Sequence, residues 1–282
     1  MAILKYRIAD IGYEISGTEN IIADESDEFK DSENTASDIT IKMEPSRNIE
    51  IEPGKPLLKD DIIWTKRDDG GYNLYVQNIK TREILCSLNV DKDWKNSVIR
   101  YNSDICSEDY ALNGPLGEIL FRNRILYKDG IVIHAAAIEW KGHGIVFTAP
   151  SGTGKSTQAN LWKVHKGARI INGDRPALKM EDGKMLVCGT PWSGAKPEFL
   201  NIKAPVSAIV VLKQAPNNSI KRLSTEESLV NLLPRLFLPY YDNQMMNIAT
   251  SFSEKIISST PVYMLECRPD IEAVELVEKC LM

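Results

Sequence analysis

The chain has 282 residues, of which 43% are hydrophobic and 26% are charged, a balance typical of a protein with a buried core. This length allows one large domain or two moderate ones. The formal net charge of −5 argues against bulk electrostatic binding of nucleic acid, and no apolar run is long enough to span a bilayer. Five cysteines without a C-x-x-C pair, and an N-terminus without a long apolar region, predict a cytoplasmic protein with reduced thiols.

Residues 1–110 predict a β-rich module. Alternating apolar positions predict one strand over residues 3–15. Six further short runs predict strands at residues 39–43, 49–53, 61–67, 72–78, 82–90 and 97–102. The acidic residues 24–38 predict a solvated, mobile loop, with a docking segment as the alternative. The module carries no catalytic pattern, so its role is either structural or the docking of a substrate protein or second subunit.

Residues 111–282 predict a second domain with mixed α/β structure. The second half of residues 107–128 predicts a helix, with Pro115 suited to its first turn. Residues 131–140 and 144–148 predict a hairpin joined by a glycine-containing turn. This hairpin leads directly into the most informative loop of the chain.

That loop has the composition of a phosphate-binding loop, because glycines allow several backbone N–H groups to point into one concavity at a helix N-terminus. The pattern G-x-x-x-x-G-K-[ST] is matched except at its first position, where Ala149 requires a negative φ or some strain. The candidate nucleotide-binding residues are Ala149, Pro150, Ser151, Gly152, Thr153, Gly154, Lys155, Ser156 and Thr157. Lys155 would bind the β and γ phosphates and Ser156 would bind Mg²⁺. The alternative is an accidental Gly/Ser turn.

A second cluster of candidates follows the helix expected at residues 155–165. Asp174 follows an expected strand at 168–172, where a carboxylate can reach Mg²⁺ or an attacking hydroxyl; otherwise it is a solvated turn residue. Residues 175–188 predict another hairpin. The glycine-bounded loop 189–194 carries Trp192, which either lines a site or is a buried residue of a surface turn.

The last part of the chain predicts two strands, the first of them buried, and three helices. The expected elements are a strand at 205–213, helices at 224–236 and 240–258, a strand at 262–267 and a helix at 270–280. Ser224 and Glu227 form a predicted capping box. Arg175 and Arg235 are weaker candidates for anion contacts, with structural or surface roles as the alternative.

Three motifs resemble the catalytic domain of HPr kinase/phosphorylase and its relatives: HAAA at 134–137, APSGTGKST at 149–157 and NGDR at 172–175. GTPWSG at 189–194 resembles a broad group of bacterial HPr-kinase-related proteins, some of which are associated with modified-peptide biosynthesis. The resemblance covers residues 112–282. It implies an α/β catalytic domain similar to that of phosphoenolpyruvate carboxykinase, preceded here by the β-rich module, and a homo-oligomer.

The resemblance assigns two further residues. His134 matches the family histidine, which implies contact with the phosphates or with a catalytic carboxylate. Asp174 matches the second of two adjacent aspartates, and Gly173 stands where the family has the first. Asp174 would therefore act alone, as a base or as an indirect Mg²⁺ ligand. GTPWSG also replaces the family's glutamate-containing signature, so phosphorylase activity and HPr as acceptor stay open.

These observations predict a kinase that uses Mg²⁺ and ATP, or another nucleoside triphosphate. It would transfer a phosphoryl group to a hydroxyl, a serine of a protein or peptide, with no membrane or nucleic-acid partner. His134 would support Asp174 or the transferred group, unless it is a packed strand histidine. Two alternatives are a nucleotide-binding accessory protein without transfer activity, which Gly173 favours, and a kinase of a small molecule such as a free hydroxy amino acid.

Overall fold

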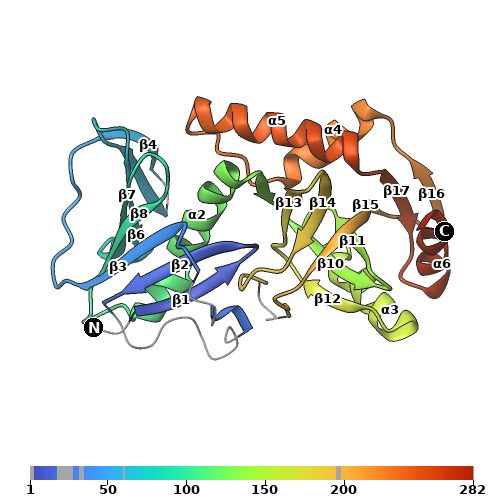
Figure 1. Ribbon diagram of the computed structural model, residues 1–282, viewed down its shortest axis with the longest axis horizontal. Coiled ribbons are helices and arrows are strands. Elements are labelled where there is room, and N and C mark those ends of the chain that lie inside the picture. Colours follow the sequence, from blue (N-terminus) through green and yellow to red (C-terminus); the bar gives the residue numbers. More distant parts are fainter. Residues whose placement is uncertain (1–2, 18–27, 32–34, 60, 195–197, 282) are drawn as a thin grey trace. The chain divides into compact units, whose positions relative to one another are not determined.

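The chain folds into two compact units, Met1–Tyr127 and Lys128–Met282. The computed structural model describes residues 3–17, 28–31, 35–59, 61–194 and 198–281. Both units combine a sheet with helices, so the protein is mixed α/β with a β-rich N-terminal unit, as predicted (Figure 1). The division at Tyr127 lies later than the boundary that the sequence pattern places at residue 110, because α1 (Glu108–Asn113) packs against the sheet of the first unit.

The first unit contains one eight-stranded sheet, followed by short helices. Its strands are β1 (Ile3–Ile8), β2 (Ile11–Ser16), β3 (Ile39–Pro45), β4 (Lys55–Lys59), β5 (Ile62–Lys66), β6 (Tyr72–Gln77), β7 (Ile84–Val90) and β8 (Asn96–Tyr101). They lie in the order β1-β2-β3-β8-β7-β6-β5-β4. β3 is parallel to both of its neighbours, and the other pairs are antiparallel. After α1 come α2 (Pro115–Arg124) and the 3-10 turn η2 (Ile125–Lys128).

The prediction of one strand over residues 3–15 is wrong, because β1 and β2 form a hairpin. Ala9 and Asp10 take left-handed backbone conformations, with φ of 49° and 62°, and reverse the chain in two residues. The Arg7 guanidinium donates to the Asp10 carbonyl at 3.1 Å. Neither glycine nor proline marks this turn, so the sequence pattern did not reveal it.

The predicted strand at residues 49–53 is also wrong, since this run is irregular and the strand follows at β4. The Glu52 N–H donates to the Tyr75 hydroxyl at 2.9 Å instead of pairing with a strand. Of the predicted acidic loop 24–38, residues 24–27 and 32–34 lie outside the described residues. Within the rest, Phe29 is buried and Asp31 pairs with Arg7 at 3.0 Å, so these two residues are held by the fold.

The helical region predicted within 107–128 begins earlier than expected and is split in two. Ser107 caps α1 by accepting from the Tyr110 N–H at 3.1 Å. Gly114 separates the helices, and Pro115 opens α2 at the position expected for it.

The second unit contains a nine-stranded sheet with helices packed against it. Its strands are β9 (Gly130–Val132), β10 (Ala135–Trp140), β11 (His143–Thr148), β12 (Arg169–Asn172), β13 (Ala177–Glu181), β14 (Lys184–Cys188), β15 (Lys203–Gln214), β16 (Ser219–Arg222) and β17 (Val262–Cys267). The helical elements are α3 (Lys155–Lys166), α4 (Thr225–Leu232), η3 (Leu233–Arg235), α5 (Asn243–Ser259) and α6 (Ile271–Leu281). β16 was not predicted.

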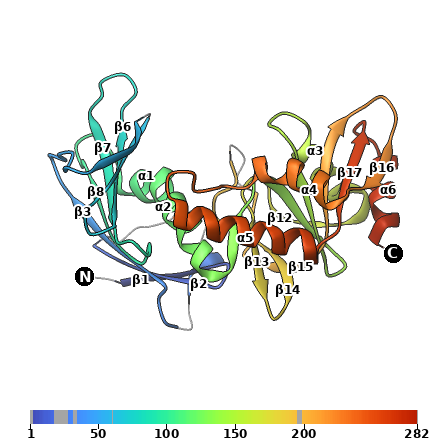
Figure 2. The same cartoon turned by 90° about the horizontal axis from the view of Figure 1, so that it is seen from above.

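The long strand β15 joins the two halves of this sheet. The sheet order is β12-β10-β11-β15-β14-β13-β9, and β17 pairs with both β15 and β16. β15 pairs with β14 at its start, through Lys203–Pro205, and with the parallel strands β11 and β17 further on. The carboxyl ends of these parallel strands therefore share one edge of the sheet. α5 packs against β9 and β14, and Figure 2 shows it beside β14.

The predicted hairpin is confirmed for β10 and β11, but the expected strand 131–140 is broken at His134. β9 pairs with β13, whereas β10 pairs with β11 and β12, so the chain changes partners between them. At the change, the His134 N–H donates to the Arg235 carbonyl at 2.8 Å and the Ala135 N–H to the Asp174 carbonyl at 3.0 Å. The break thus brings three distant chain segments together.

Small residues in β10 allow α3 to pack closely on the sheet. Ala135, Ala136 and Ala137 are fully buried, and α3 contacts β10, β11 and α6. Trp162 of α3 packs edge-on against Trp140, with ring centroids 5.3 Å apart. This core fixes the N-terminus of α3 relative to the ends of β11 and β12.

The capping box predicted at the start of α4 is present and gives a stability test. Ser224 Oγ accepts from the Glu227 N–H at 3.2 Å, and the Glu227 carboxylate accepts from the Ser224 N–H at 3.0 Å. Ser224→Ala should lower the free energy of unfolding by about 1 kcal/mol, because a helix N–H loses its partner. Urea denaturation followed by tryptophan fluorescence measures this. Ser251→Ala, at an exposed position inside α5, should be neutral or slightly stabilising; equal losses in both variants would contradict the assignment.

Candidate active site

The loop Ala149–Gly154 joins the end of β11 to the start of α3. Gly152 and Gly154 have φ values of 76° and 110°, a region that side chains disfavour. Ala149 is fully buried and is not among the residues with positive φ, so alanine fits the first position without strain. Of the two possibilities that the sequence left for Ala149, a negative φ or some strain, the structure shows the first. The loop therefore has glycine at the two positions with left-handed backbone conformation, as an anion-binding turn requires.

Lys155 begins α3 and is 7% exposed. Its ammonium donates to the carbonyls of Ala149 at 3.2 Å and Pro150 at 3.4 Å. Burial lowers the pKa of Lys155, while the Asp174 carboxylate opposes this effect and the Arg235 charge adds to it. The structure thus brings the predicted Lys155 and Asp174 within electrostatic reach of each other.

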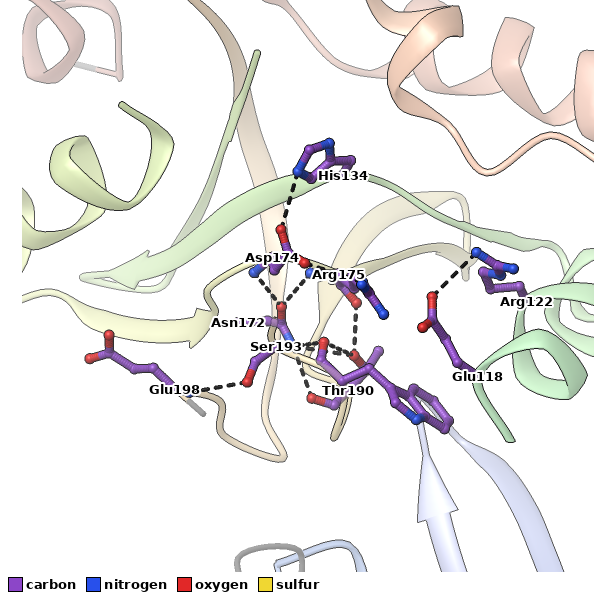
Figure 3. Close-up of polar contacts among 10 residues, drawn as sticks. Glu118, Arg122, His134, Asn172, Asp174, Arg175, Thr190, Ser193 and Glu198 are labelled. Carbon is purple, nitrogen blue, oxygen red and sulfur yellow. Dashed lines mark hydrogen bonds and ion pairs between the residues drawn. The ribbon is translucent and has the colours of Figure 1, made fainter. Parts of the chain in front are cut away.

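A fully buried asparagine, Asn172, organises the turn that carries Asp174. Its side-chain oxygen accepts from the N–H groups of Asp174 at 2.8 Å and Arg175 at 2.6 Å. Its amide donates to the carbonyls of Thr190 at 2.9 Å and Trp192 at 3.1 Å (Figure 3). Asn172 therefore fastens this turn to the loop 189–194. No local pattern assigns this role to Asn172, although an asparagine followed by glycine at the end of an apolar strand is a signal that could have indicated it.

Asp174 is held by a donor on each carboxylate oxygen. His134 Nε2 lies 3.2 Å from Oδ1, and Arg175 Nε donates to Oδ2 at 3.1 Å (Figure 3). Backbone contacts fix His134 itself, since Ile133 and Ala135 on either side bond to the carbonyls of Pro176 and Asp174. His134 therefore contacts a carboxylate, one of the two contacts that the resemblance implies for it.

His134 lies in a positive environment. Burial lowers its pKa most, the charge of Lys155 lowers it further, Asp174 opposes the shift, and Arg235 and Arg175 add to it. The imidazole is therefore neutral at pH 7. With its proton on Nε2, it can donate to Asp174 without adding a charge to the site.

Two glycines shape the surroundings of Asp174. A Cβ atom at Gly194, where φ is 77°, would lie 3.0 Å from Asp174 Oδ2, so a side chain there would press on the carboxylate. A Cβ atom at Gly173 would meet nothing closer than the Glu198 carbonyl at 3.6 Å. The loop 189–194 thus closes over one side of Asp174, whereas Gly173 has room for a Cβ atom.

The loop borders a cavity of about 570 Å³ at the edge where the parallel strands end. Its walls come from Pro150–Thr153, from Val211–Gln214 of β15, from α4 and from Arg235. This volume falls within the range of small-molecule sites. Among the weaker candidates, Arg235 therefore lies at the cavity, Arg175 lies on Asp174, and Trp192 is partly exposed with its backbone held by Asn172.

The oxygen ligands expected for Mg²⁺, the Ser156 hydroxyl and the Asp174 carboxylate, are present, but they are few. Ser156 and Thr157 are exposed in the first turn of α3, and the Ser156 hydroxyl has no hydrogen bond to any described residue. Within the described ranges, no group of three or more His, Cys, Asp or Glu could hold a metal. One hydroxyl and one carboxylate fit Mg²⁺ only as it binds with a nucleotide, where phosphates and water supply the other ligands.

Comparison with known families gives a clear match over most of the second unit and part of the first. The model of the SynChlorMet cassette protein ScmC matches residues 84–268, more than half of the chain. The chain belongs to the ScmC family. This family name states no reaction. No curated protein matches this ScmC-family chain.

One solved structure similar to this ScmC-family protein is the HPr(Ser) kinase/phosphatase from Coxiella burnetii. The identity is 13%, the TM-score is 0.32, and the match covers 52% of this chain and 94% of that chain. Values this low do not establish a common fold, so the relation expected from the motifs stays a prediction. In the part of the chain that the structure describes, no helix is long and apolar enough to cross a membrane. All five cysteines are free.

The charges around His134 predict how its titration responds to substitution. Because its pKa is lowered, His134 contributes stability above the unfolded value of about 6.5 that is lost as the pH falls through the folded value. Lys155→Gln should raise the pKa, because a neighbouring positive charge is removed, and Asp174→Asn should lower it further. Imidazole proton NMR measures both shifts. Lys255→Gln, which removes a distant ammonium paired with Asp129, is the control; equal titration in all variants would contradict this electrostatic arrangement.

Proposed function

We propose that this protein is a Mg²⁺- and ATP-dependent kinase that phosphorylates a hydroxyl, a serine of a protein or peptide. One observation carries the proposal: Lys155, at the end of a glycine loop and at a helix N-terminus, lies within electrostatic reach of Asp174, which contacts His134. Phosphoryl transfer needs this combination, because its catalysis consists mainly of positioning and charge stabilisation.

The loop 149–154 and the first turn of α3 would hold the nucleotide phosphates. Backbone N–H groups at the start of α3 attract anions, and Lys155 would exchange the carbonyls of Ala149 and Pro150 for phosphate oxygens. Ser156 and Asp174 would hold Mg²⁺, which supplies charge neutralisation at the phosphates when bound. The nucleoside would occupy the cavity beside Pro150–Thr153.

Asp174 and His134 would act on the acceptor. The carboxylate is held in one orientation by His134 and Arg175, so it can accept a hydrogen bond from the acceptor hydroxyl and direct its oxygen at the γ phosphorus. Neutral His134 supports that orientation without adding a proton-donating cation. The loop 189–194, tied to Asp174 through Asn172, would border the acceptor.

A nucleotide-binding accessory protein without transfer activity is the second candidate. Gly173 favours it, because the resemblance implies a pair of carboxylates and this chain supplies one. A Cβ atom at this position would meet no close contact, so the surroundings do not require glycine there. The free hydroxy amino acid kinase differs only in the acceptor, and acceptor screening distinguishes it.

Two substitutions separate the kinase from the accessory protein. Lys155→Ala should weaken Mg²⁺-ATP binding by at least about tenfold, because a charge-assisted contact worth about 1.5–3 kcal/mol is lost. Asp174→Asn should leave binding within a few-fold and lower turnover by about 10²–10⁴-fold. Calorimetry measures binding, and transfer of γ-³²P to serine peptides or to free L-serine measures turnover.

Lys255→Ala, outside the site, serves as the control for Lys155→Ala. Tight binding of ATP without transfer to any acceptor would favour the accessory protein. No binding by the wild type would contradict both nucleotide-dependent functions.

A further inference from the structure

The centre of the site carries more positive than negative charge. Three cations, Lys155, Arg175 and Arg235, lower the pKa of His134, and Arg235 also lowers that of Lys155. Among the described residues, Asp174 is the one carboxylate that opposes these shifts. Desolvated cations without counter-ions are unfavourable unless an anion joins them, so this arrangement is built for a polyanion.

Of these cations, Arg235 is the one left without a partner. Arg175 pairs with Asp174, and Lys155 bonds to loop carbonyls. The Arg235 side chain is partly buried and forms no hydrogen bond or ion pair with any residue in the described ranges. An arginine whose role was to stabilise the fold would have its planar donors engaged.

The backbone holds Arg235 in a fixed place beside His134. The Arg235 carbonyl accepts from the His134 N–H at 2.8 Å, and the Phe237 N–H donates to the Val132 carbonyl at 3.0 Å. Leu236 also bridges Ile133 in antiparallel fashion. Residues 235–237 thus run alongside 132–134 like a short strand, which makes the position of Arg235 independent of any ligand.

The side chain of Arg235 projects to the cavity that the glycine loop borders. The Arg235 backbone is bonded to His134, which contacts Asp174, so Arg235 joins the cavity wall to the carboxylate that faces the site. Lys155 comes from the loop side and Arg235 from the end of η3. Arg235 thus lines the same cavity as Pro150–Thr153 of the glycine loop that precedes Lys155.

We propose that Arg235 binds the terminal phosphoryl group of a nucleoside triphosphate opposite Lys155, so that the site distinguishes triphosphates from diphosphates. This inference rests on the proposed kinase function. In the transfer, the bond from the γ phosphorus to the β-phosphate oxygen breaks and its electron pair stays on the diphosphate. A bond to the acceptor oxygen forms, and the hydroxyl proton leaves through Asp174 to water. Arg235 stabilises the charge on the moving group, as a guanidinium suits planar, bidentate contact with phosphate.

Inorganic polyphosphates test this contact without a nucleoside. With Mg²⁺ present, calorimetry should show that the wild type binds tripolyphosphate at least about tenfold tighter than pyrophosphate, since only the longer anion reaches Arg235. Arg235→Gln should bring the ratio close to one, and Arg235→Lys should give an intermediate ratio. Arg169→Gln, whose arginine pairs with Glu139 at the opposite end of β12 from Asn172, should leave the ratio unchanged.

A second readout distinguishes this role from a structural one. Circular dichroism should show an unchanged fold in Arg235→Gln, and urea denaturation should show an unchanged free energy of unfolding, whereas loss of a structural arginine would lower that free energy. If the wild type binds both anions in a Lys155-dependent way but Arg235→Gln keeps the ratio, the inference about Arg235 is overturned and the proposed function stands. If the wild type binds neither anion, nor Mg²⁺-ATP, both are overturned.

Discussion

The side chain of one buried residue, Asn172, determines whether the site can exist. It accepts two N–H bonds from the turn that carries Asp174 and donates to two carbonyls of the loop 189–194. Buried backbone groups that lose such partners are strongly unfavourable, so the turn and the loop adopt these conformations together. Asp174 is thereby presented to His134 at one place, and the loop that carries Gly194 closes beside it.

The interrupted strand at His134 has a matching role on the other side of the carboxylate. Between β9 and β10 the backbone N–H groups donate to the carbonyls of Asp174, Pro176 and Arg235. Residues from three separate segments therefore converge where the parallel strands end, next to the glycine loop. Cations outnumber carboxylates there, which is the charge balance that the proposed polyphosphate ligand requires.

Local sequence signals predicted the glycine loop, its flanking strand and helix, and the capping box at Ser224, because each depends on neighbouring residues. They failed at Ala9–Asp10 and at residues 49–53, where tertiary contacts and not glycine or proline set the backbone. Local signals could not predict the role of Asn172 or the placement of Arg235, because their hydrogen-bond partners lie far along the chain. The pairing of His134 with Asp174 came from family resemblance, not from periodicity.

A crystal structure with Mg²⁺ and a non-hydrolysable ATP analogue tests the central claim most directly. The account predicts the β and γ phosphates against the N–H groups of the loop 149–154, with Lys155 moved from the Ala149 carbonyl to phosphate oxygens. Arg235 should contact the terminal phosphate, and Asp174 should face it from the side of His134. An analogue bound elsewhere, with Lys155 still on the loop carbonyls, would contradict the account.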